Sequence, residues 1–351
     1  MSPSTNGTSN GGRRRATRAD VAQLAGTSTA VVSYVINNGP RPVAPETAER
    51  VRAAIRDLNY RPNAVARSLR LQRTHALGLV VPDLANPFFA ELASAIEMNA
   101  AEYGQALLLG NSLDSEEREA RNLRTFGDYR VDGLIIVPVA SGSGSVALLR
   151  DLDMPVVVLD RPVPGAGAPT VMPDNRAGAA AATQHLLEHG YAEVGCIAGP
   201  EAIMTAAERL QGWRQAIAAA GLNAHERWVV HSEFDRDAGY RVAIELLSQP
   251  ARPRALFVSS DEQAFGVLKA SARLGLRVPD DLALVGFDGL RHSRSTVPSL
   301  ATMRQPFERY GELAVSLIHQ NRAGMSEITR LPVTLQSGGT CGCSDDPREG
   351  V

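Results

Sequence analysis

The chain of 351 residues is poor in cysteine, in aromatic residues and in long hydrophobic runs. Its three cysteines, Cys196, Cys341 and Cys343, imply no disulfide framework. Its apolar runs, such as 77–81 and 155–159, are far too short to span a bilayer, so no membrane association is expected. The polar residues 1–15 do not resemble a secretory signal peptide, because no apolar stretch follows them. The expected compartment is therefore the cytoplasm.

The composition is that of an ordinary soluble protein, with 44% hydrophobic and 21% charged residues. This apolar content excludes disorder over the whole length, and the length allows two domains with a small third. The net charge of −2 hides an asymmetry. Residues 1–75 hold twelve arginines, no lysine and four acidic residues, a balance of +8, whereas the remainder carries −10. A basic N-terminal module on an acidic body indicates a polyanionic partner for the first part only.

Residues 1–15 are predicted to form a flexible tail, and residues 16–62 several short helices. Thr17 is a candidate cap for the first helix, Gly26 ends it, and Ser28 is a candidate cap for the second. Two short helices joined in this way have the form of a helix-turn-helix, whose second helix enters the major groove. A small helical bundle without nucleic acid is the alternative, and the positive charge favours DNA. The candidate contacts near the start of the second helix are Thr29, Ala30, Ser33 and Tyr34.

From residue 77 onward, short runs rich in Val, Ile and Leu alternate with amphipathic stretches of helical spacing. This alternation predicts parallel sheets with helices on both faces. The segment is too long for one small sheet, so we expect two doubly wound lobes that divide near residues 173–174. The predicted strands are 77–81, 106–109, 134–137, 156–159, 194–198, 256–258 and 282–285.

Polar side chains follow four of these predicted strands. Ligands of open α/β sheets bind at the carboxyl ends of the strands, where carboxylates, amides and arginines can form paired hydrogen bonds with hydroxyl groups. Phe88 and Phe89 could cover the C–H face of a sugar ring. The alternative for each single residue is that it caps the next helix. The four polar groups are Asn86, Asp160–Arg161, Ser260–Asp261 and Asp288.

Enzyme signatures are weak. A phosphate-binding loop of the type GxxxxGK[ST] is missing. Residues 185–189 match the H-x-x-E-H pattern of some zinc peptidases, with His185, Glu188 and His189, but no third ligand is evident. The C-x-C pair Cys341 and Cys343 lies in a glycine-rich tail without evident partners and is read as incidental. We therefore expect no metal, no cofactor and no catalytic residue.

Many segments in the same order resemble the lactose-repressor (LacI/GalR) family of bacterial transcription regulators. The resemblance covers residues 17–340 and implies a helix-turn-helix head on a periplasmic-binding-protein-like body. The segments are 20–28 (DVAQLAGTS), 32–37 (VSYVIN), 58–69 (LNYRPNAVARSL), 82–89 (PDLANPFF), 131–135 (VDGLI), 160–162 (DRP), 209–213 (RLQGW) and 285–288 (VGFD).

The resemblance implies that Thr29, Ala30 and Tyr34 lie on the recognition helix, where they would meet base edges. It also implies that residues 63–69 form a hinge helix, which inserts Leu69 between base steps in the minor groove and kinks the duplex. Such a short helix would form only with DNA and a partner hinge. The DNA-binding residues expected in this way are Thr17, Ser28, Thr29, Ala30, Ser33, Tyr34, Asn63, Ala66, Arg67 and Leu69.

The resemblance extends the ligand site to an arginine, a glutamine and an aromatic residue. Three positions depart from the family pattern: Ala207 and Ser260 at the cleft leave the effector open, and Ala44 replaces a capping serine, which should weaken the start of the third helix by roughly 1 kcal/mol. The effector-binding residues expected are Asn86, Phe88, Phe89, Asp160, Arg161, Arg209, Phe234, Asp261, Asp288 and Gln305.

The sequence thus predicts a homodimeric, nucleoid-associated repressor that a small sugar-like effector releases from a palindromic operator. A co-repressor-dependent regulator of the same family and a sugar-binding module without DNA function are the alternatives. The expected parts are a tail (1–15), a DNA-binding head (16–62), a hinge and linker (63–74), an effector-binding and dimerisation body (75–340) and a flexible tail (341–351). Within the body, the first lobe would hold 75–174 and 303–323, and the second 175–302 and 324–340.

Overall fold

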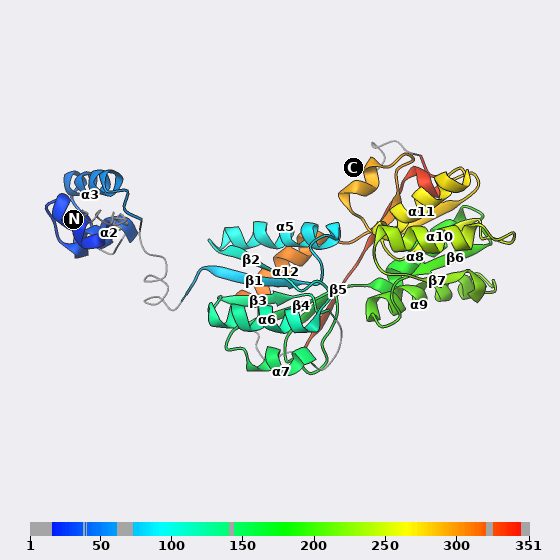
Figure 1. Ribbon diagram of the computed structural model, residues 1–351, viewed down its shortest axis with the longest axis horizontal. Helices are drawn as coiled ribbons and strands as arrows, with labels where there is room; N and C mark the ends of the chain where they lie inside the picture. Colours follow the sequence, from blue (N-terminus) through cyan, green and yellow to red (C-terminus); the bar gives the residue numbers. More distant parts are fainter. Residues whose placement is uncertain are drawn as a thin grey trace, which may run out of the picture. The chain divides into compact units, whose positions relative to one another are not determined.

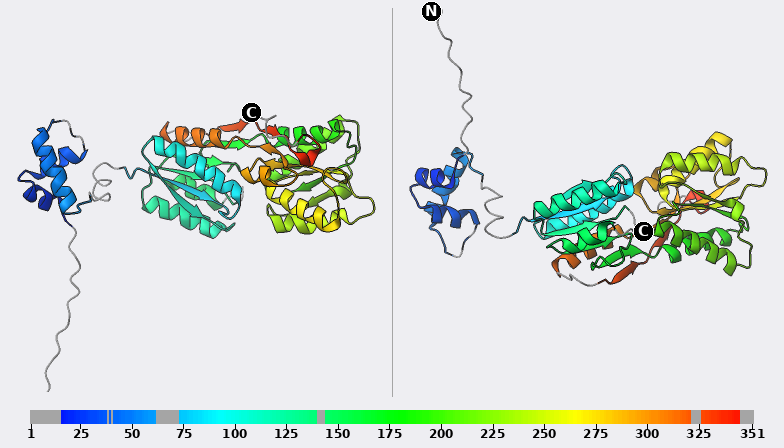
Figure 2. Two further views of the ribbon diagram at one scale, coloured as in Figure 1. Left: turned by 90° about the horizontal axis from the view of Figure 1, so that it is seen from above. Right: turned by 60° about the horizontal axis from the view of Figure 1, so that its bottom comes forward.

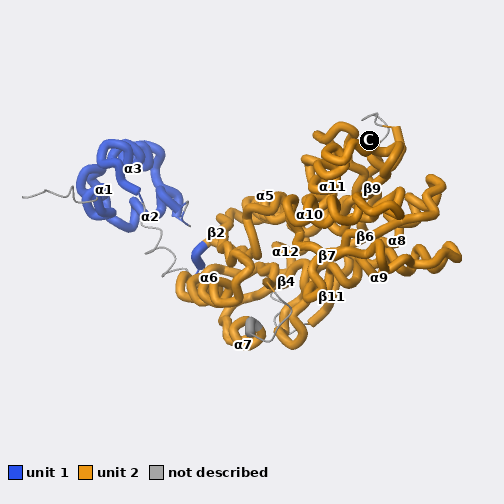
Figure 3. The backbone as a smooth tube through the Cα atoms, turned by 45° about the vertical axis from the view of Figure 1, so that its right-hand side comes forward, with its two compact units in different colours: residues 1–74 blue, residues 75–351 orange. Residues whose placement is uncertain are grey.

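The computed structural model describes residues 16–37, 39, 41–61, 73–139, 144–320 and 326–344. The chain divides into two compact units, residues 1–74 and residues 75–351, which Figure 3 distinguishes by colour. None of the described helices is long and apolar enough to cross a bilayer. The predicted tail 1–15 and the predicted hinge residues Asn63, Ala66, Arg67 and Leu69 lie outside the described residues.

The first unit contains three helices, and both predicted N-caps are present. The backbone amide of Asp20 donates to Thr17 Oγ1 at 3.3 Å, and the amide of Thr17 donates to the Asp20 carboxylate at 2.7 Å. Ser28 Oγ accepts from the amide of Val31 at 3.3 Å. These bonds satisfy backbone donors that the first turn of a helix leaves without partners. The helices are α1 (Arg18–Leu24), α2 (Thr29–Asn37) and α3 (Pro45–Asp57).

A turn at Gly26 and a small core hold these helices together. Gly26, between α1 and α2, has φ +61°, a left-handed conformation that side chains other than glycine rarely adopt. α3 begins at Ala44 without a side-chain cap, as the sequence predicts. The core consists of Val21, Ala22, Ala25, Val32, Val51, Ala54 and Tyr60, so each helix buries one apolar stripe.

The first lobe of the second unit is a six-stranded, fully parallel sheet in the order β11-β5-β4-β3-β1-β2 (Figure 1). Helices α5 and α12 bury apolar side chains against one face of the sheet, and α6 and α7 against the other. The strands are β1 (Ala76–Val81), β2 (Ala106–Asn111), β3 (Gly133–Ile136), β4 (Val156–Leu159), β5 (Thr170–Pro173) and β11 (Ile328–Leu331). The helices are α5 (Pro87–Glu102), α6 (Glu116–Asp128), α7 (Gly144–Asp151) and α12 (Phe307–His319).

The second lobe is a six-stranded sheet in the order β12-β10-β9-β8-β6-β7, parallel except for the edge strand β12. Helices α8 and α9 pack on one face, and α10 and α11 on the other. The strands are β6 (Val194–Ala198), β7 (Val229–His231), β8 (Ala255–Val258), β9 (Ala283–Asp288), β10 (Ala301–Arg304) and β12 (Thr334–Gln336). The helices are α8 (Asn175–Glu188), α9 (Met204–Ala219), α10 (Arg236–Leu247) and α11 (Asp261–Leu274), with 3₁₀ turns η1 (Glu226–Trp228), η2 (Arg291–Ser295) and η3 (Gly339–Cys341).

The predicted fold class is confirmed, because each lobe is a doubly wound sheet and each predicted strand is present. Figure 2 shows the two lobes side by side. The chain passes between them after β5, after β10 and after β11. The last passage differs from the expectation for residues 324–340, because β11 pairs with β5 at the edge of the first sheet and only β12 belongs to the second.

The end of the described chain also differs from the sequence expectation. Residues 341–344, which were assigned to a flexible tail, are part of the fold, and Cys341 is fully buried. The Thr340 hydroxyl donates to the carbonyl of Leu284 at 2.9 Å and accepts from the amide of Ala301 at 2.8 Å. These two bonds dock η3 on β9 and β10.

Candidate functional site

The outer face of α2 carries four of the predicted DNA-contacting residues. Thr29 and Ala30 are exposed in its first turn, and Ser33 and Tyr34 are half-buried one turn later. Val32 is fully buried in the core shared with α1 and α3, and it holds the opposite side of the helix. α2 therefore presents small and polar side chains near its N-terminal end, the part of a recognition helix that meets base edges.

The ring of Tyr34 packs against Gly39, two residues after the end of α2. A Cβ atom on Gly39 would lie 2.6 Å from Tyr34 Cδ1, so the ring packs where only glycine leaves room. Asn37 donates from Nδ2 to the backbone oxygen of Ser33 at 2.8 Å and to Ser33 Oγ at 3.2 Å. Sequence analysis missed Asn37 because it belongs to an Asn-Asn-Gly-Pro break. Its spacing of four residues from Ser33 was the signal that places it on the same face.

The hydroxyls of Thr17 and Ser28 serve as helix caps. Thr17 Oγ1 also donates to the Asp20 carboxylate at 2.8 Å. Both side chains are exposed at the start of a helix. The structure thus gives them a local role, and their contact with DNA stays a prediction.

Two carboxylates at the carboxyl ends of strands form the centre of a second site, in the second unit. Asp160 follows β4 of the first lobe, and Asp288 ends β9 of the second lobe. Their residues are only 5% and 6% exposed. Both have positive φ, 63° for Asp160 and 127° for Asp288. Strained backbone of this kind persists only where the surroundings impose it, and it gathers at ligand sites.

Arg209 on α9 joins the second-lobe side of this site. Its guanidinium is 3.4 Å from Asp288 Oδ1 and donates to Asn175 Oδ1 at 2.8 Å and to the carbonyl of Ser259 at 2.5 Å. The guanidinium carbon lies 3.9 Å from the ring centroid of Phe287. A buried arginine held by this many partners is a fixed fork of donors.

Gln305 and Tyr310 complete the cluster from the crossover between β10 and α12. Gln305 Nε2 donates to Asp288 Oδ1 at 2.9 Å, and Tyr310 Oη donates to Gln305 Oε1 at 3.4 Å. Both residues are fully buried. Burial raises the pKa of Tyr310 well above its usual value, and the nearby negative charge of Asp160 adds to the shift. The sequence pointed to Gln305 but not to Tyr310, which reads as an ordinary apolar-face residue of a helix.

Some polar atoms of the cluster have no hydrogen-bond partner among the described residues. They are Asp160 Oδ1, Arg161 Nε and Ser259 Oγ, all buried. The second carboxylate oxygen of Asp160 lies 3.5 Å from Arg161 Nε. Arg161 Nη1 donates to the carbonyls of Pro138 and Val139, at 3.1 and 2.8 Å, and so binds the end of β3. Because a buried polar atom without a partner is costly, these atoms mark a place for a polar ligand.

Asn86 connects the two lobes. Its Oδ1 accepts from the amide of Phe88 at 3.0 Å and caps α5, while its Nδ2 donates to the carbonyl of Phe234 at 3.3 Å. Asn86 therefore caps α5 and at the same time bonds to the second lobe, and its contact with an effector stays a prediction. The ring of Phe234 is half-buried and packs on Gly199, where a Cβ atom would lie 2.3 Å from the ring.

The two phenylalanines of α5 face inward. Phe88 and Phe89 are each 6% exposed, and the Phe88 ring centroid lies 5.1 Å from that of Phe89 and 5.4 Å from that of Phe307. Both belong to the large apolar core of the body. They form the apolar wall behind Asn86 rather than an exposed stacking platform.

Asp261 has contacts that differ from those of a ligand-binding carboxylate. It is fully buried, and it accepts from Thr302 Oγ1 at 2.5 Å and from the amide of Leu290 at 2.8 Å. Burial raises the pKa of Asp261 well above its usual value, with the charge of Asp288 adding. Its carboxylate therefore binds the turn after β9, which carries Asp288. Ser260 caps α11 by accepting from the amide of Gln263 at 3.2 Å.

Asn175, a residue that sequence analysis did not single out, anchors Arg209. It is fully buried at the start of α8, directly after the second lobe begins. Its Nδ2 donates to the carbonyl of Pro173 and to Glu208, each at 3.3 Å. The polar pair Asp174–Asn175 behind a strand was the available signal, of the same kind as that of Asp160–Arg161.

The electrostatics of the site centre on Asp288. Burial raises the pKa of Asp288 to about 7, the charge of Arg209 and the hydrogen bond from Gln305 oppose that shift, and the charge of Asp160 adds to it. The influence of Asp160 indicates that carboxylates from the two lobes are close enough to repel each other. A ligand that donates hydroxyls to both would relieve this repulsion.

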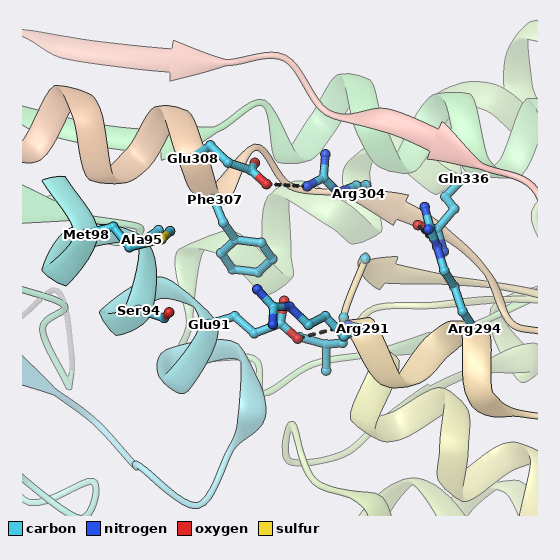
Figure 4. Close-up of a pocket in the computed structure, with 12 residues that line it drawn as sticks. Glu91, Ser94, Ala95, Met98, Arg291, Arg294, Arg304, Phe307, Glu308 and Gln336 are labelled. Atoms are coloured by element: carbon cyan, nitrogen blue, oxygen red, sulfur yellow. Dashed lines mark hydrogen bonds and ion pairs between the residues drawn. The ribbon is translucent and has the colours of Figure 1, made fainter. Parts of the chain in front are cut away.

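A separate pocket of about 520 Å³ lies between α5 and α12 of the first lobe and residues 289–304 of the second (Figure 4). None of the predicted effector-binding residues lines it. Its two carboxylates have partners: Glu91 accepts from the backbone amide of Arg291 at 2.9 Å, and Glu308 accepts from Arg304 at 2.6 Å. The buried polar cluster, with its atoms that lack partners, is the better candidate for effector binding.

Comparison with known proteins identifies the family of both units. Residues 17–63 match the bacterial regulatory proteins of the lacI family, and residues 74–335 match the periplasmic binding proteins and sugar binding domain of the LacI family. The ribose operon repressor of Escherichia coli K12 is 38% identical over 322 residues, which are 91% of this chain and 97% of that protein. The transcriptional repressor PurR of Escherichia coli ATCC 8739 is 38% identical over 305 residues, 86% of this chain and 89% of that protein.

A solved structure of the lac repressor dimer bound to operator and the anti-inducer ONPF is similar over most of the chain. Its TM-score is 0.83 at 26% identity, over 93% of this chain and 99% of that chain. The resemblance inferred from the motifs is thereby confirmed. Because the relatives are repressors, the interpretations as an enzyme and as a sugar-binding module without DNA function are set aside. The head is a DNA-binding domain, the body is an effector-binding domain, and the chain belongs to the LacI family of bacterial regulatory proteins.

Proposed function

We propose that this protein is a homodimeric repressor that binds a near-palindromic operator and leaves it when a small polyhydroxylated effector binds between the two lobes of the body. The proposal that an effector binds between the lobes rests on the buried cluster of Asp160, Arg209, Asp288 and Gln305, whose polar groups come from both lobes. The proposal that the head binds an operator rests on the exposed face of α2.

The chemistry of the cluster suits a sugar or a sugar derivative. Carboxylates accept hydrogen bonds from neighbouring hydroxyls, and the Arg209 fork donates to a ring or hydroxyl oxygen. Asp160 Oδ1 supports this assignment because it is buried without a hydrogen-bond partner among the described residues. Phe234 could cover a C–H face of the ligand. Since a relative is a ribose operon repressor, D-ribose is the first probe.

A second copy of the chain is the proposed partner of the first lobe's edge. β2 is the last strand of its sheet, and Leu108 and Leu109 on it are 37% and 49% exposed. Met98 and Leu113 nearby in the chain are also exposed, at 53% and 50%. An apolar edge strand left in water is an aggregation hazard that a homodimer removes. The lac repressor structure is likewise a dimer.

The effector would act by favouring one arrangement of the lobes. It must bind the two arrangements unequally, and operator DNA must then weaken effector binding by the same factor. The predicted hinge, residues 63–69, lies outside the described residues, and its part in this coupling stays a prediction. A co-repressor would give the opposite sign.

The first test is the selection of bound sequences from a random pool of duplex DNA. We expect an enriched palindrome whose half-sites lie about one helical turn apart, because two symmetric heads read it. Repeating the selection with D-ribose, other aldoses and purines separates induction from co-repression: a ligand that depletes the palindrome is an inducer, and one needed for enrichment is a co-repressor. The absence of enrichment under all conditions would contradict the operator half of the proposal.

Effector affinity should rise with pH. Only the ionised Asp288 carboxylate accepts two hydroxyl hydrogen bonds, so effector binding favours the ionised form and releases a proton. With the pKa of Asp288 at about 7, affinity should be roughly tenfold lower at pH 6 than at pH 8. Calorimetry at pH 7 in phosphate and in Tris measures the released proton directly. An affinity that is flat between pH 6 and pH 8 would show that the effector does not contact an ionised Asp288.

A further inference from the structure

Four side chains far from the effector cluster meet at the C-terminal end of α8. His185 lies in the last turn of that helix, His189 directly follows it, and Cys341 and Cys343 come from the end of the described chain. One ligand atom from each lies within 4.8 Å of the other three. Two imidazole nitrogens and two thiol sulfurs are therefore gathered at one point, although up to 158 residues separate them in sequence.

Three of the distances between these atoms are close to those between neighbouring ligands of a tetrahedral metal ion. The distance from His185 Nε2 to Cys341 Sγ is 3.2 Å, from His185 Nε2 to Cys343 Sγ 3.5 Å, and from His189 Nε2 to Cys343 Sγ 3.3 Å. Zinc bonds of about 2.0 Å to nitrogen and about 2.3 Å to sulfur in a tetrahedron place nitrogen and sulfur about 3.5 Å apart. The three observed nitrogen–sulfur separations lie close to that value, and all four ligand atoms lie within 4.8 Å of one another.

Local structure explains why the four side chains converge. His185 and His189 are four residues apart and so point to the same side of the helix, with ring centroids 4.6 Å apart. Gly342, between the cysteines, has φ +96°, a left-handed conformation that lets both thiols turn toward α8. A Cβ atom at Gly342 would lie 3.7 Å from His189 Nδ1, so the segment already contacts the histidines. Thr340 fixes the segment from the other side through β9 and β10.

We propose that His185, His189, Cys341 and Cys343 bind one structural Zn²⁺ ion, which fastens the C-terminal segment to α8. Zinc favours a tetrahedral set of two nitrogens and two sulfurs, and four protein ligands leave no open position for a substrate or an activated water. The H-x-x-E-H match therefore belongs to a structural site and not to a peptidase. Glu188, the base in the peptidase interpretation, instead accepts from Gln184 Nε2 at 3.1 Å. The sequence-based reading of the C-x-C pair as lacking partners is wrong.

The site would also support the effector cluster from a distance. α8 carries the histidines at one end and Asn175, the partner of Arg209, at the other. A metal that clamps the far end of this helix restricts its movement against β9 and β10, on which η3 is docked. The proposal stands on the four ligands alone and does not depend on the identity of the effector.

The test is to purify the full-length protein without a histidine tag and to measure its metal content by inductively coupled plasma mass spectrometry. We expect one zinc per chain, with a dissociation constant tighter than about 1 nM in competition with a chromophoric chelator. Cys341→Ser with Cys343→Ser should abolish zinc, and so should His189→Gln. Cobalt uptake should give the thiolate charge-transfer absorption of tetrahedral Co²⁺ in the wild type and none in the double variant.

Two matched controls should keep the full zinc content. His292→Gln changes an exposed histidine on η2, and Cys196→Ala changes a buried cysteine of β6. Removal of zinc from the wild type by a strong chelator should lower the melting temperature by roughly 5–10 °C, so the proposal does not rely on variants that fail to fold.

Three results would overturn the proposal. The wild type could neither contain nor take up zinc at micromolar concentration. The double cysteine variant could retain one zinc per chain. Mass spectrometry of the alkylated, unreduced protein could find Cys341 and Cys343 joined as a disulfide in the protein as isolated.

Discussion

Arg209→Ala should weaken effector binding about 100-fold or more and leave operator binding intact, so that the operator stays occupied when effector is added. Arg209 is 4% exposed, and its guanidinium contacts Asn175, Ser259 and Asp288. Its removal leaves the Asp288 charge buried without its cationic partner and removes the donor fork from the ligand site. Truncating one member of a buried pair costs about 3–5 kcal/mol. Calorimetry with the effector and operator titrations with and without it measure both parts.

The matched control lies on the same helix. Arg214 on α9 pairs with Glu226 at 2.9 Å, but its side chain is 45% exposed. Because such surface pairs contribute less than about 1 kcal/mol, Arg214→Ala should change effector affinity less than twofold. Arg209→Lys keeps the charge but not the planar fork, so it should be intermediate. If Arg209→Ala binds effector as well as the wild type, the effector site lies elsewhere, and the pocket of Figure 4 becomes the candidate.

Ala30→Glu should weaken operator binding roughly 100-fold or more while the head stays folded. Ala30 is exposed in the first turn of α2, so glutamate fits there without disturbing the core, and a carboxylate near the helix N-terminus favours the helix itself. On DNA, the same side chain would place a negative charge against base edges and phosphates. Like charges brought together at an interface cost several kcal/mol. Fluorescence anisotropy with the selected operator measures the loss, and circular dichroism checks the fold.

Thr47→Glu is the control for this prediction. It adds the same charge in the first turn of α3, outside the recognition helix, and it should reduce operator affinity less than about fivefold through long-range repulsion alone. Equal losses in the two variants would mean that α2 does not enter the groove and that the head binds DNA only through its net charge.

Local sequence patterns predicted most of the fold. Runs of Val, Ile and Leu mark most of the central strands, because strands buried on both faces have no polar side to alternate with. Thr17, Gly26 and Ser28 mark the ends of α1 and α2 through bonds to neighbours within a few residues. The short strands β5, β7, β10, β11 and β12 were missed, because three or four residues are too few to show a distinct periodicity.

The candidate site was found in outline from the same local signals. Parallel strands bring their carboxyl ends to one edge, so polar residues behind strands predict a common site. Asp160, Asp288 and Arg161 follow that rule. The orientation of each side chain did not follow from it: Asp261 obeys the same rule, yet its carboxylate turns toward Thr302 and the amide of Leu290.

By itself, the sequence determined the helix-turn-helix head, the two doubly wound lobes, the polar strand ends and the family to which these belong, because each depends on patterns within a few tens of residues. Only the tertiary structure decided which distant groups meet. The hydrogen bond from Arg209 to Asn175, the pairing of β11 with β5, and the contact of Cys341 with His185 at 3.2 Å all result from packing. Such contacts join segments up to 158 residues apart. Periodicity along the chain carries no information on distances across it, so these pairings became visible only once the sheets were assembled.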